Sequence, residues 1–213
     1  MRWTTRFRSR LPITLAFLQA FALGGCVSFS SYGEPAARFD TPAVARAFIP
    51  LVGSEHLVLE DHGAAVAIAP GIAVTNAHNS SMVDPKSVIG TSTEYDLLFF
   101  RTSAPPLIET ASPAADEKVV AYGEGGDSDL RVADGVVRWT DAPVLPRCDT
   151  CSVQHAFAFA ADAGPGFSGG PVLDAASGAL LGIVFGYRDV DGQRLMYAYD
   201  MALVEKERAR LAP

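Results

Sequence analysis

The sequence lacks the motifs by which proteins hold nucleotides, cofactors or metal ions. Its 213 residues contain no phosphate-binding glycine loop, no metal motif and no cofactor fingerprint. They also contain no low-complexity tract and no internal repeat. We therefore expect a globular protein that needs no cofactor and no metal.

Basic residues are scarce as well. The chain has 17 Lys and Arg against 24 Asp and Glu, and four of the arginines lie within residues 1–10. If residues 1–25 are removed as a signal peptide, 13 basic residues remain and the net charge becomes −11. A chain with this negative charge is repelled by nucleic acid and by anionic lipid, so we expect it to bind neither through electrostatic attraction.

Long hydrophobic runs are limited to residues 11–23, which follow the arginine-rich start in the pattern of a secretory signal peptide. A helix of this length covers about 20 Å, too little to span a membrane comfortably. The run ends in L-G-G-C at 23–26, which resembles the lipobox of bacterial lipoproteins. The resemblance implies cleavage after residue 25 and lipidation of Cys26. Ordinary signal cleavage near an incidental cysteine is the alternative.

The residues after Cys26 predict where the protein is held. Val27 stands where an aspartate is associated with retention in the inner membrane, so the resemblance implies an outer-membrane anchor facing the periplasm. Residues 26–41 are expected to form the lipidated N-terminus and a flexible tether, with the folded domain over 42–213.

Only two further cysteines are present, in C-D-T-C at 148–151. In an oxidising compartment, a disulfide between Cys148 and Cys151 is the first expectation. A zinc site would need four ligands; His155 could supply a third, and no fourth is evident. Redox chemistry of the thioredoxin kind would need the motif to open a helix.

Short apolar segments separated by Gly and Pro turns predict about a dozen strands in two halves. They lie at 56–60, 64–69, 72–74, 88–93, 97–100, 118–122, 130–139, 153–159, 171–173, 179–185 and 194–198. Helices are expected at 42–51, ended by Pro50, and at 200–211, capped by Asp200. We expect an all-β fold of two six-stranded antiparallel barrels with a short C-terminal helix, and a junction near 104–117. The strand count alone leaves a sandwich or one larger barrel open.

The stretch D-A-G-P-G-F-S-G-G-P-V-L at 162–173 crowds glycine and proline around Ser168. A turn that presents a hydroxyl and then enters a buried strand needs this composition. A glycine-rich hairpin turn is the simpler interpretation. Acyl transfer by a serine also needs an imidazole base and an orienting acid. His78 and Asp96 each lie at the edge of an apolar run and are the candidates, with Asp84 as an alternative acid.

Three motifs resemble those of the trypsin-like (chymotrypsin-fold) serine endopeptidases. T-N-A-H at 75–78 is similar to their histidine motif and D-L-L-F-F at 96–100 to their aspartate motif. G-F-S-G-G-P-V-L at 166–173 resembles their serine motif, and A-D-G-V-V at 133–137 resembles a strand of the Deg-type branch. The resemblance covers about residues 55–205 and leaves no room for a PDZ module.

The resemblance implies two perpendicular barrels with the active site between them. Ser168 would attack the substrate carbonyl, His78 would act as general base and acid, and Asp96 would orient the imidazole. The N–H groups of Gly166 and Ser168 would form the oxyanion hole. The expected activity is endopeptidase cleavage of a polypeptide substrate.

The sequence departs from the family at two places. Phe167 replaces the Asp or Asn that usually precedes the serine, so activation by a freed amino terminus is not expected. The interval of 18 residues from His78 to Asp96 is short for the family. These departures keep open a catalytically silent member of the fold that binds peptides or partner proteins. The oligomeric state is also open.

The sequence indicates the substrate preference less clearly than it indicates the reaction. Asp162 lies six residues before Ser168, where enzymes that cleave after Lys or Arg carry an acid, but the same acid in Deg-type loops does not determine specificity. Val184, Phe185 and Gly186 are candidate pocket walls, and Phe185 would favour apolar or small side chains.

Overall fold

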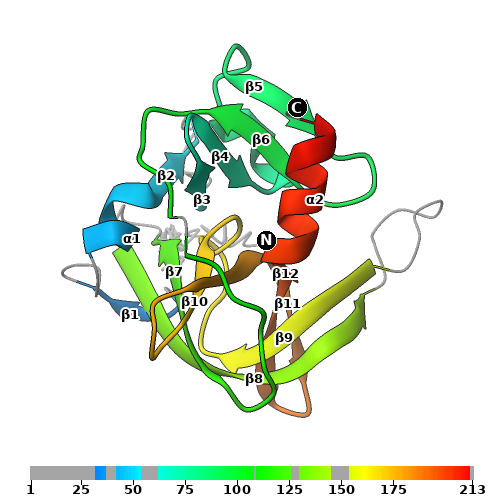
Figure 1. Ribbon diagram of the computed structural model, residues 1–213. Helices are drawn as coiled ribbons and strands as arrows, with labels where there is room; N and C mark the ends of the chain where they lie inside the picture. Colours follow the sequence, from blue (N-terminus) through cyan, green and yellow to red (C-terminus); the bar gives the residue numbers. More distant parts are fainter. Residues whose placement is uncertain are drawn as a thin grey trace, which may run out of the picture.

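Two antiparallel sheets make up most of the molecule (Figure 1). The computed structural model describes residues 32–36, 42–53, 62–107, 109–125, 130–144 and 154–211. Within these residues the first sheet has the strand order β2-β3-β4-β6-β5. Its strands are β2 (Phe48–Val52), β3 (His62–Ala69), β4 (Ile72–Thr75), β5 (Val88–Thr91) and β6 (Leu98–Arg101).

The second sheet closes on itself. Its order is β1-β8-β7-β10-β11-β12-β9, and β8 also pairs with β9, so six strands form a closed barrel to which β1 is added. The strands are β1 (Glu34–Pro35), β7 (Lys118–Glu124), β8 (Leu130–Val144), β9 (Gln154–Ala161), β10 (Pro171–Asp174), β11 (Leu180–Val190) and β12 (Gln193–Asp200). The predicted all-β, two-barrel class is confirmed, although the strand expected at 56–60 lies outside the described residues.

The helix expected at 42–51 is shorter in the structure. Helix α1 spans Pro42–Ala47, and the chain continues directly into β2. Pro50 therefore lies within a strand instead of ending a helix. It is tolerated there because, among the described residues, β2 is an edge strand that pairs only with β3, so the missing N–H breaks no ladder on the other side.

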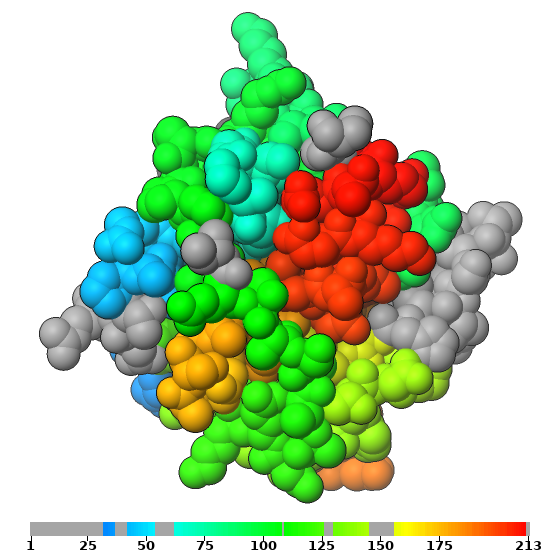
Figure 2. Space-filling model, in the orientation of Figure 1, coloured from blue at the N-terminus to red at the C-terminus, as the bar shows by residue number. Residues whose placement is uncertain are grey.

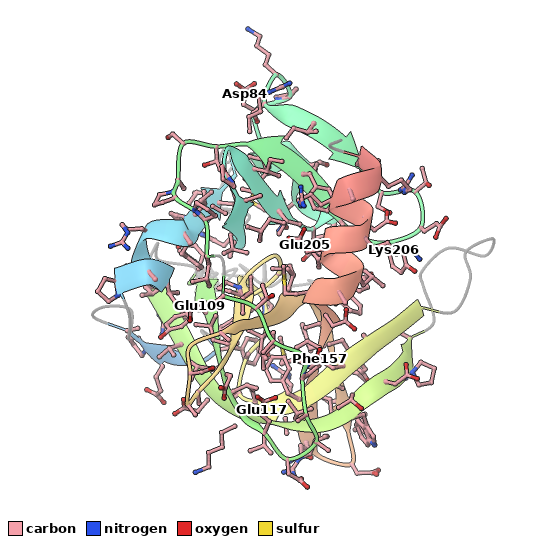
Figure 3. All side chains as sticks on the ribbon, in the orientation of Figure 1. Asp84, Glu109, Glu117, Phe157, Glu205 and Lys206 are labelled. Atoms are coloured by element: carbon pink, nitrogen blue, oxygen red, sulfur yellow. The ribbon has the colours of Figure 1, made fainter. Side chains whose placement is uncertain are left out.

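Apolar side chains from both sheets share one core. Val66 and Phe99 from the first sheet pack in the same cluster as Leu180 and Tyr199 from the second. A second cluster fills the closed barrel and includes Phe157, which Figure 3 shows among its strands. The shared cluster fixes the two sheets against each other, so residues on both can build one site.

The C-terminal helix α2 (Met201–Leu211) covers the junction of the two sheets on the face shown in Figure 2. Asp200 caps its first turn as predicted, since the Asp200 Oδ1 accepts the Leu203 N–H at 2.7 Å. The helix contacts β5 of the first sheet and β11 and β12 of the second. No helix in the described part of the chain combines the length and apolar character needed to cross a membrane.

A buried carboxylate on α2 holds the loop that precedes β6. Glu207 is 3% exposed and accepts the Ser92 hydroxyl at 2.7 Å. The Ser92 oxygen in turn accepts the N–H groups of Glu94, at 3.2 Å, and Tyr95, at 3.0 Å. Helix α2 thereby positions the residues immediately before Asp96.

This arrangement predicts a specific pH dependence of stability. The hydrogen bond from Arg210 holds the pKa of Glu207 below its usual range. The carboxylate therefore stabilises the fold above about pH 4.3, its ordinary value, and this contribution is lost as the pH falls through the lower folded value. We expect Glu207→Gln to lower the free energy of unfolding by about 1 kcal/mol at pH 7, and the difference from wild type to shrink between pH 5 and 3 in urea titrations.

Glu205→Gln is the matched control, because Glu205 also pairs with an arginine of α2 but its side chain is 38% exposed. We expect its effect to stay below about 0.5 kcal/mol at every pH. Identical pH profiles for wild type and Glu207→Gln would contradict the role given to Glu207.

Candidate active site

The imidazole of His78 and the carboxylate of Asp96 form a close pair. His78 Nδ1 lies 2.6 Å from Asp96 Oδ2. A carboxylate only accepts hydrogen bonds, so the proton of the neutral ring is on Nδ1 and Nε2 is left as a free base. The His78 side chain is 48% exposed, so the ring is partly open to solvent. The interval of 18 residues is thus long enough to bring the pair together.

Asp96 is held by groups from several elements. Its Oδ1 accepts the His78 backbone N–H at 3.0 Å, and its carbonyl accepts the Asn76 side-chain amide at 2.9 Å. Its own N–H donates to the Tyr199 hydroxyl at 3.2 Å, which reaches across from β12. Burial raises the pKa of Tyr199, so that hydroxyl stays neutral beside the carboxylate. The Tyr199 ring stacks on Phe185 at 4.1 Å between centroids.

Asp84, the alternative acid, lies elsewhere. Figure 3 shows it at the outer tip of the first sheet, away from α2. Its Oδ1 accepts the Lys86 N–H at 3.0 Å, and its carbonyl accepts the Ser87 hydroxyl at 2.7 Å. These bonds are those of a residue that stabilises its own turn.

Ser168 is tied to the first sheet through its backbone. Its carbonyl accepts the Ala64 N–H at 2.8 Å and the Asn79 side-chain amide at 3.0 Å. Asn79 directly follows His78, so the motif that carries the imidazole also holds the serine. A side chain at Gly169 would overlap the Ala64 carbonyl and the Thr75 hydroxyl, and glycine is required for this close approach.

The residues before Ser168 form a type II turn. The Phe167 N–H donates to the Gly164 carbonyl at 3.1 Å, with Pro165 second and Gly166 third at φ +91°. The Gly166 carbonyl is held by the Glu124 N–H of β7 at 3.0 Å. Within the described residues, the N–H groups of Gly166 and Ser168 have no hydrogen-bond acceptor. They are therefore available to an oxyanion.

The four residues considered for the substrate pocket do not lie together. Val184 is buried beside the Ser168 turn, where its carbonyl accepts the Gly169 N–H at 2.8 Å. Phe185 and Gly186 follow it on β11 and are half-buried. Asp162 is exposed and lines a cavity of about 920 Å³ on the second sheet, to whose lining neither Ser168 nor His78 contributes.

The structure describes no candidate metal site: within the residues it covers, no three His, Cys, Asp or Glu side chains gather closely enough to hold an ion. The predicted lipidation site Cys26 and the predicted disulfide of Cys148 and Cys151 lie outside the described residues, so both remain predictions.

The sequence motifs predicted His78, Asp96 and Ser168 as candidates but not the polar residues that hold them in the structure. Thr75 donates to the Ala64 carbonyl at 2.7 Å and accepts from Asn79 at 3.0 Å. Asn76 and Tyr199 hold Asp96. The signal for Thr75 and Asn76 was available, because both belong to the T-N-A-H motif and are fully buried polar residues. Nothing local in the sequence marks Tyr199, which acts across the two sheets.

Comparison with known proteins identifies a family and a fold. Residues 50–183 match the sequence family described as a trypsin-like peptidase domain. The fold is similar to the active form of the Rv3671c protease from M. tuberculosis, with a TM-score of 0.67 and 19% identity over 99% of this chain and 95% of that one. It is also similar to the MamO protease domain from Magnetospirillum magneticum, with a TM-score of 0.60 and 18% identity over 78% and 97%.

A third similar structure is the HtrA-type protease AlgW with a tripeptide, at a TM-score of 0.61 and 20% identity over 80% of this chain and 62% of that one. No curated protein matches the chain. At these identities the solved structures support the fold, and the family match extends over most of the chain.

The turn geometry predicts a large effect of Gly166→Ala on reactivity. A Cβ at Gly166 would overlap the Glu124 carbonyl oxygen, and φ +91° disfavours any side chain. Relaxation to a type I turn reverses the central peptide and turns the Gly166 N–H away. We expect the rate of reaction with a fluorophosphonate to fall by about 10²- to 10³-fold in the folded fraction.

Gly71→Ala is the matched control, since Gly71 has φ +77° but nothing within 4 Å of an added Cβ. We expect it to cost about 1 kcal/mol of stability and to leave the reaction rate unchanged. A Gly166→Ala variant that reacts as fast as Gly71→Ala would contradict the assignment of the Gly166 N–H.

Proposed function

The chain belongs to the family of trypsin-like peptidases and is a serine-type peptide hydrolase, and from that premise we propose that it is a lipid-anchored endopeptidase with a Ser168–His78–Asp96 triad. The observation that carries the proposal is the 2.6 Å contact between His78 Nδ1 and Asp96 Oδ2. It is supported by Asn79, the residue after His78, whose side-chain amide donates a hydrogen bond to the Ser168 carbonyl.

The proposed reaction begins with attack of Ser168 Oγ on the scissile carbonyl. His78 Nε2 takes the hydroxyl proton and gives it to the leaving amine, so that an acyl-enzyme and a free amino terminus are formed. Water then attacks the ester, with His78 again taking the proton and returning it to Ser168. Asp96 stays ionised and stabilises the imidazolium.

Charge on the tetrahedral intermediate is proposed to be met by the Gly166 and Ser168 N–H groups. Both are free of acceptors within the described chain, and the Gly166 carbonyl is fixed by Glu124. One such donor is worth about 3 kcal/mol of barrier lowering, which makes the turn as important as the base.

The substrate is proposed to be a polypeptide whose side chain before the scissile bond lies along β11. Val184 is bonded to Gly169 and Gly170 through its carbonyl and N–H, so the residues that follow it, Phe185 and Gly186, start beside the nucleophile. Asp162 lines a separate cavity and is not given a role in specificity.

The anchor is proposed to be lipidated Cys26 in the bacterial outer membrane, with the domain in the periplasm. The sequence L-G-G-C after a short apolar run supports it. Tyr32, the first described residue, follows Cys26 by six positions. A chain of this length spans at most about 20 Å, so an anchored domain would stay close to the membrane surface.

The triad predicts the outcome of labelling the full-length protein with a fluorophosphonate. We expect the wild type to be labelled at one site and Ser168→Ala not at all. His78→Ala and Asp96→Asn should react at least about 10³-fold more slowly, because the hydroxyl loses its base or the ring loses its tautomer. Asp84→Asn, the matched control for the acid, should react like wild type.

Two results would contradict this triad. A folded wild type that is not labelled would favour a silent, peptide-binding member of the fold, which peptide capture could then measure. Labelling retained in Ser168→Ala would place the nucleophile elsewhere.

The anchor predicts incorporation of an alkyne-bearing fatty acid when the full chain is expressed in a Gram-negative bacterium. Wild type and Cys148→Ser should both carry the label and sediment with outer membranes. Cys26→Ser should lose the label and leave the membrane fraction. Membrane association of an unlabelled Cys26→Ser protein would rule out lipidation as the anchor.

A further inference from the structure

The short strand β1 adds the N-terminal segment to the barrel beside the nucleophile turn. Glu34 pairs with Val132 and Pro35 with Arg131, and the Ala36 N–H donates to the Leu130 carbonyl at 2.9 Å. Figure 1 shows β1 lying along β8. Residues 32–36 are therefore built into the second sheet.

The backbone of this segment also contacts Phe167, whose side chain is fully buried. Gly123 of β7 lies at the base of the ring, where a Cβ would be 2.7 Å from Phe167 Cγ. Gly33, at φ +72°, lies at the tip of the ring, where a Cβ would be 2.9 Å from Phe167 Cζ and 2.8 Å from the Val132 carbonyl oxygen. Neither position leaves room for a side chain, so the ring packs closely on the backbone at both ends.

Tyr32 covers the first residue of the same turn. A Cβ on Gly164 would overlap Tyr32 Cδ2, so the tyrosine ring lies directly on the Gly164 backbone. The Arg194 guanidinium lies 4.1 Å from the Tyr32 ring centroid and 4.6 Å from that of Tyr187. Asp189 fixes Arg194 with two hydrogen bonds, at 2.8 and 2.9 Å.

We propose that Tyr32 and Gly33 are positioning residues for the reaction, since they hold the turn that presents the Gly166 N–H and the Ser168 nucleophile. The proposal rests on the function given above. One hydrogen bond, from Phe167 to Gly164, closes the turn, and a second, from the Glu124 N–H to the Gly166 carbonyl, ties it to β7. Neither bond involves the peptide between Pro165 and Gly166, so the orientation of that peptide depends on what packs on the turn. Loss of the cover over Gly164 and Phe167 frees the central peptide to reverse and removes an oxyanion donor.

The test uses Tyr32→Ala in the full-length protein, with kcat and KM measured on a peptide amide and active sites titrated. We expect kcat to fall at least about tenfold, with KM changed less than about threefold, because ground-state binding does not use the oxyanion donor. Hydrogen exchange of the peptide containing residues 162–170 should become faster.

Two controls separate positioning from general stability. Tyr32→Phe keeps the ring over Gly164 and should restore the wild-type kcat and exchange rate. Glu34→Ala changes an exposed side chain of the same segment and should have no effect on either. If Tyr32→Ala does not fold, Tyr32→Leu replaces the ring over Gly164 by a smaller apolar side chain, and we expect an intermediate fall in kcat and an intermediate rise in the exchange rate.

A wild-type kcat in Tyr32→Ala, or an equal loss in Glu34→Ala, would overturn the proposal while the triad stands. An inactive wild type would instead refute the proposed function. Even then, hydrogen exchange over 162–170 reports whether Tyr32 holds the turn: unchanged exchange in Tyr32→Ala overturns the positioning role independently of activity.

Discussion

The position of Ser168 depends on a buried set of polar groups between the two sheets. The Ser168 carbonyl receives the Ala64 N–H and the Asn79 amide, and Thr75 links Asn79 back to β3. Unsatisfied, these buried groups would each cost about 1 to 3 kcal/mol. These hydrogen bonds can all form only in one relative position of the two sheets. They therefore fix Ser168 relative to the imidazole of His78, the residue before Asn79. Gly169 allows the approach because it has no side chain.

Asp96 is constrained in a similar way, by residues remote from it in sequence. Asp96 is bonded by the T-N-A-H motif from one side and by Tyr199 of the barrel from the other. The loop before it is held by Glu207 through Ser92. A carboxylate with both oxygens and both backbone groups engaged has little freedom to reorient, which keeps the imidazole in one tautomer.

The sequence predicted most strands, the C-terminal helix and the close pair of His78 and Asp96, because local periodicity and motif residues specify them. It did not predict what tertiary contacts decide. Pro50 lies in a strand, which is possible because that strand is at the edge of its sheet. Residues 27–40 have the composition of a tether, yet Tyr32–Ala36 lies on β8, since Gly33 has room to pass over Phe167. The hydrogen bond between Tyr199 and Asp96 joins residues 103 positions apart, so no local sequence pattern indicates it.

The most direct test of a working Ser168 centre is a crystal structure of the protein after reaction with a fluorophosphonate. The geometry predicts phosphorus bonded to Ser168 Oγ and a phosphoryl oxygen within hydrogen-bond distance of the Gly166 and Ser168 N–H groups. The His78 ring should keep its contact with Asp96. An adduct on another residue, or an oxygen that faces away from both N–H groups, would contradict it.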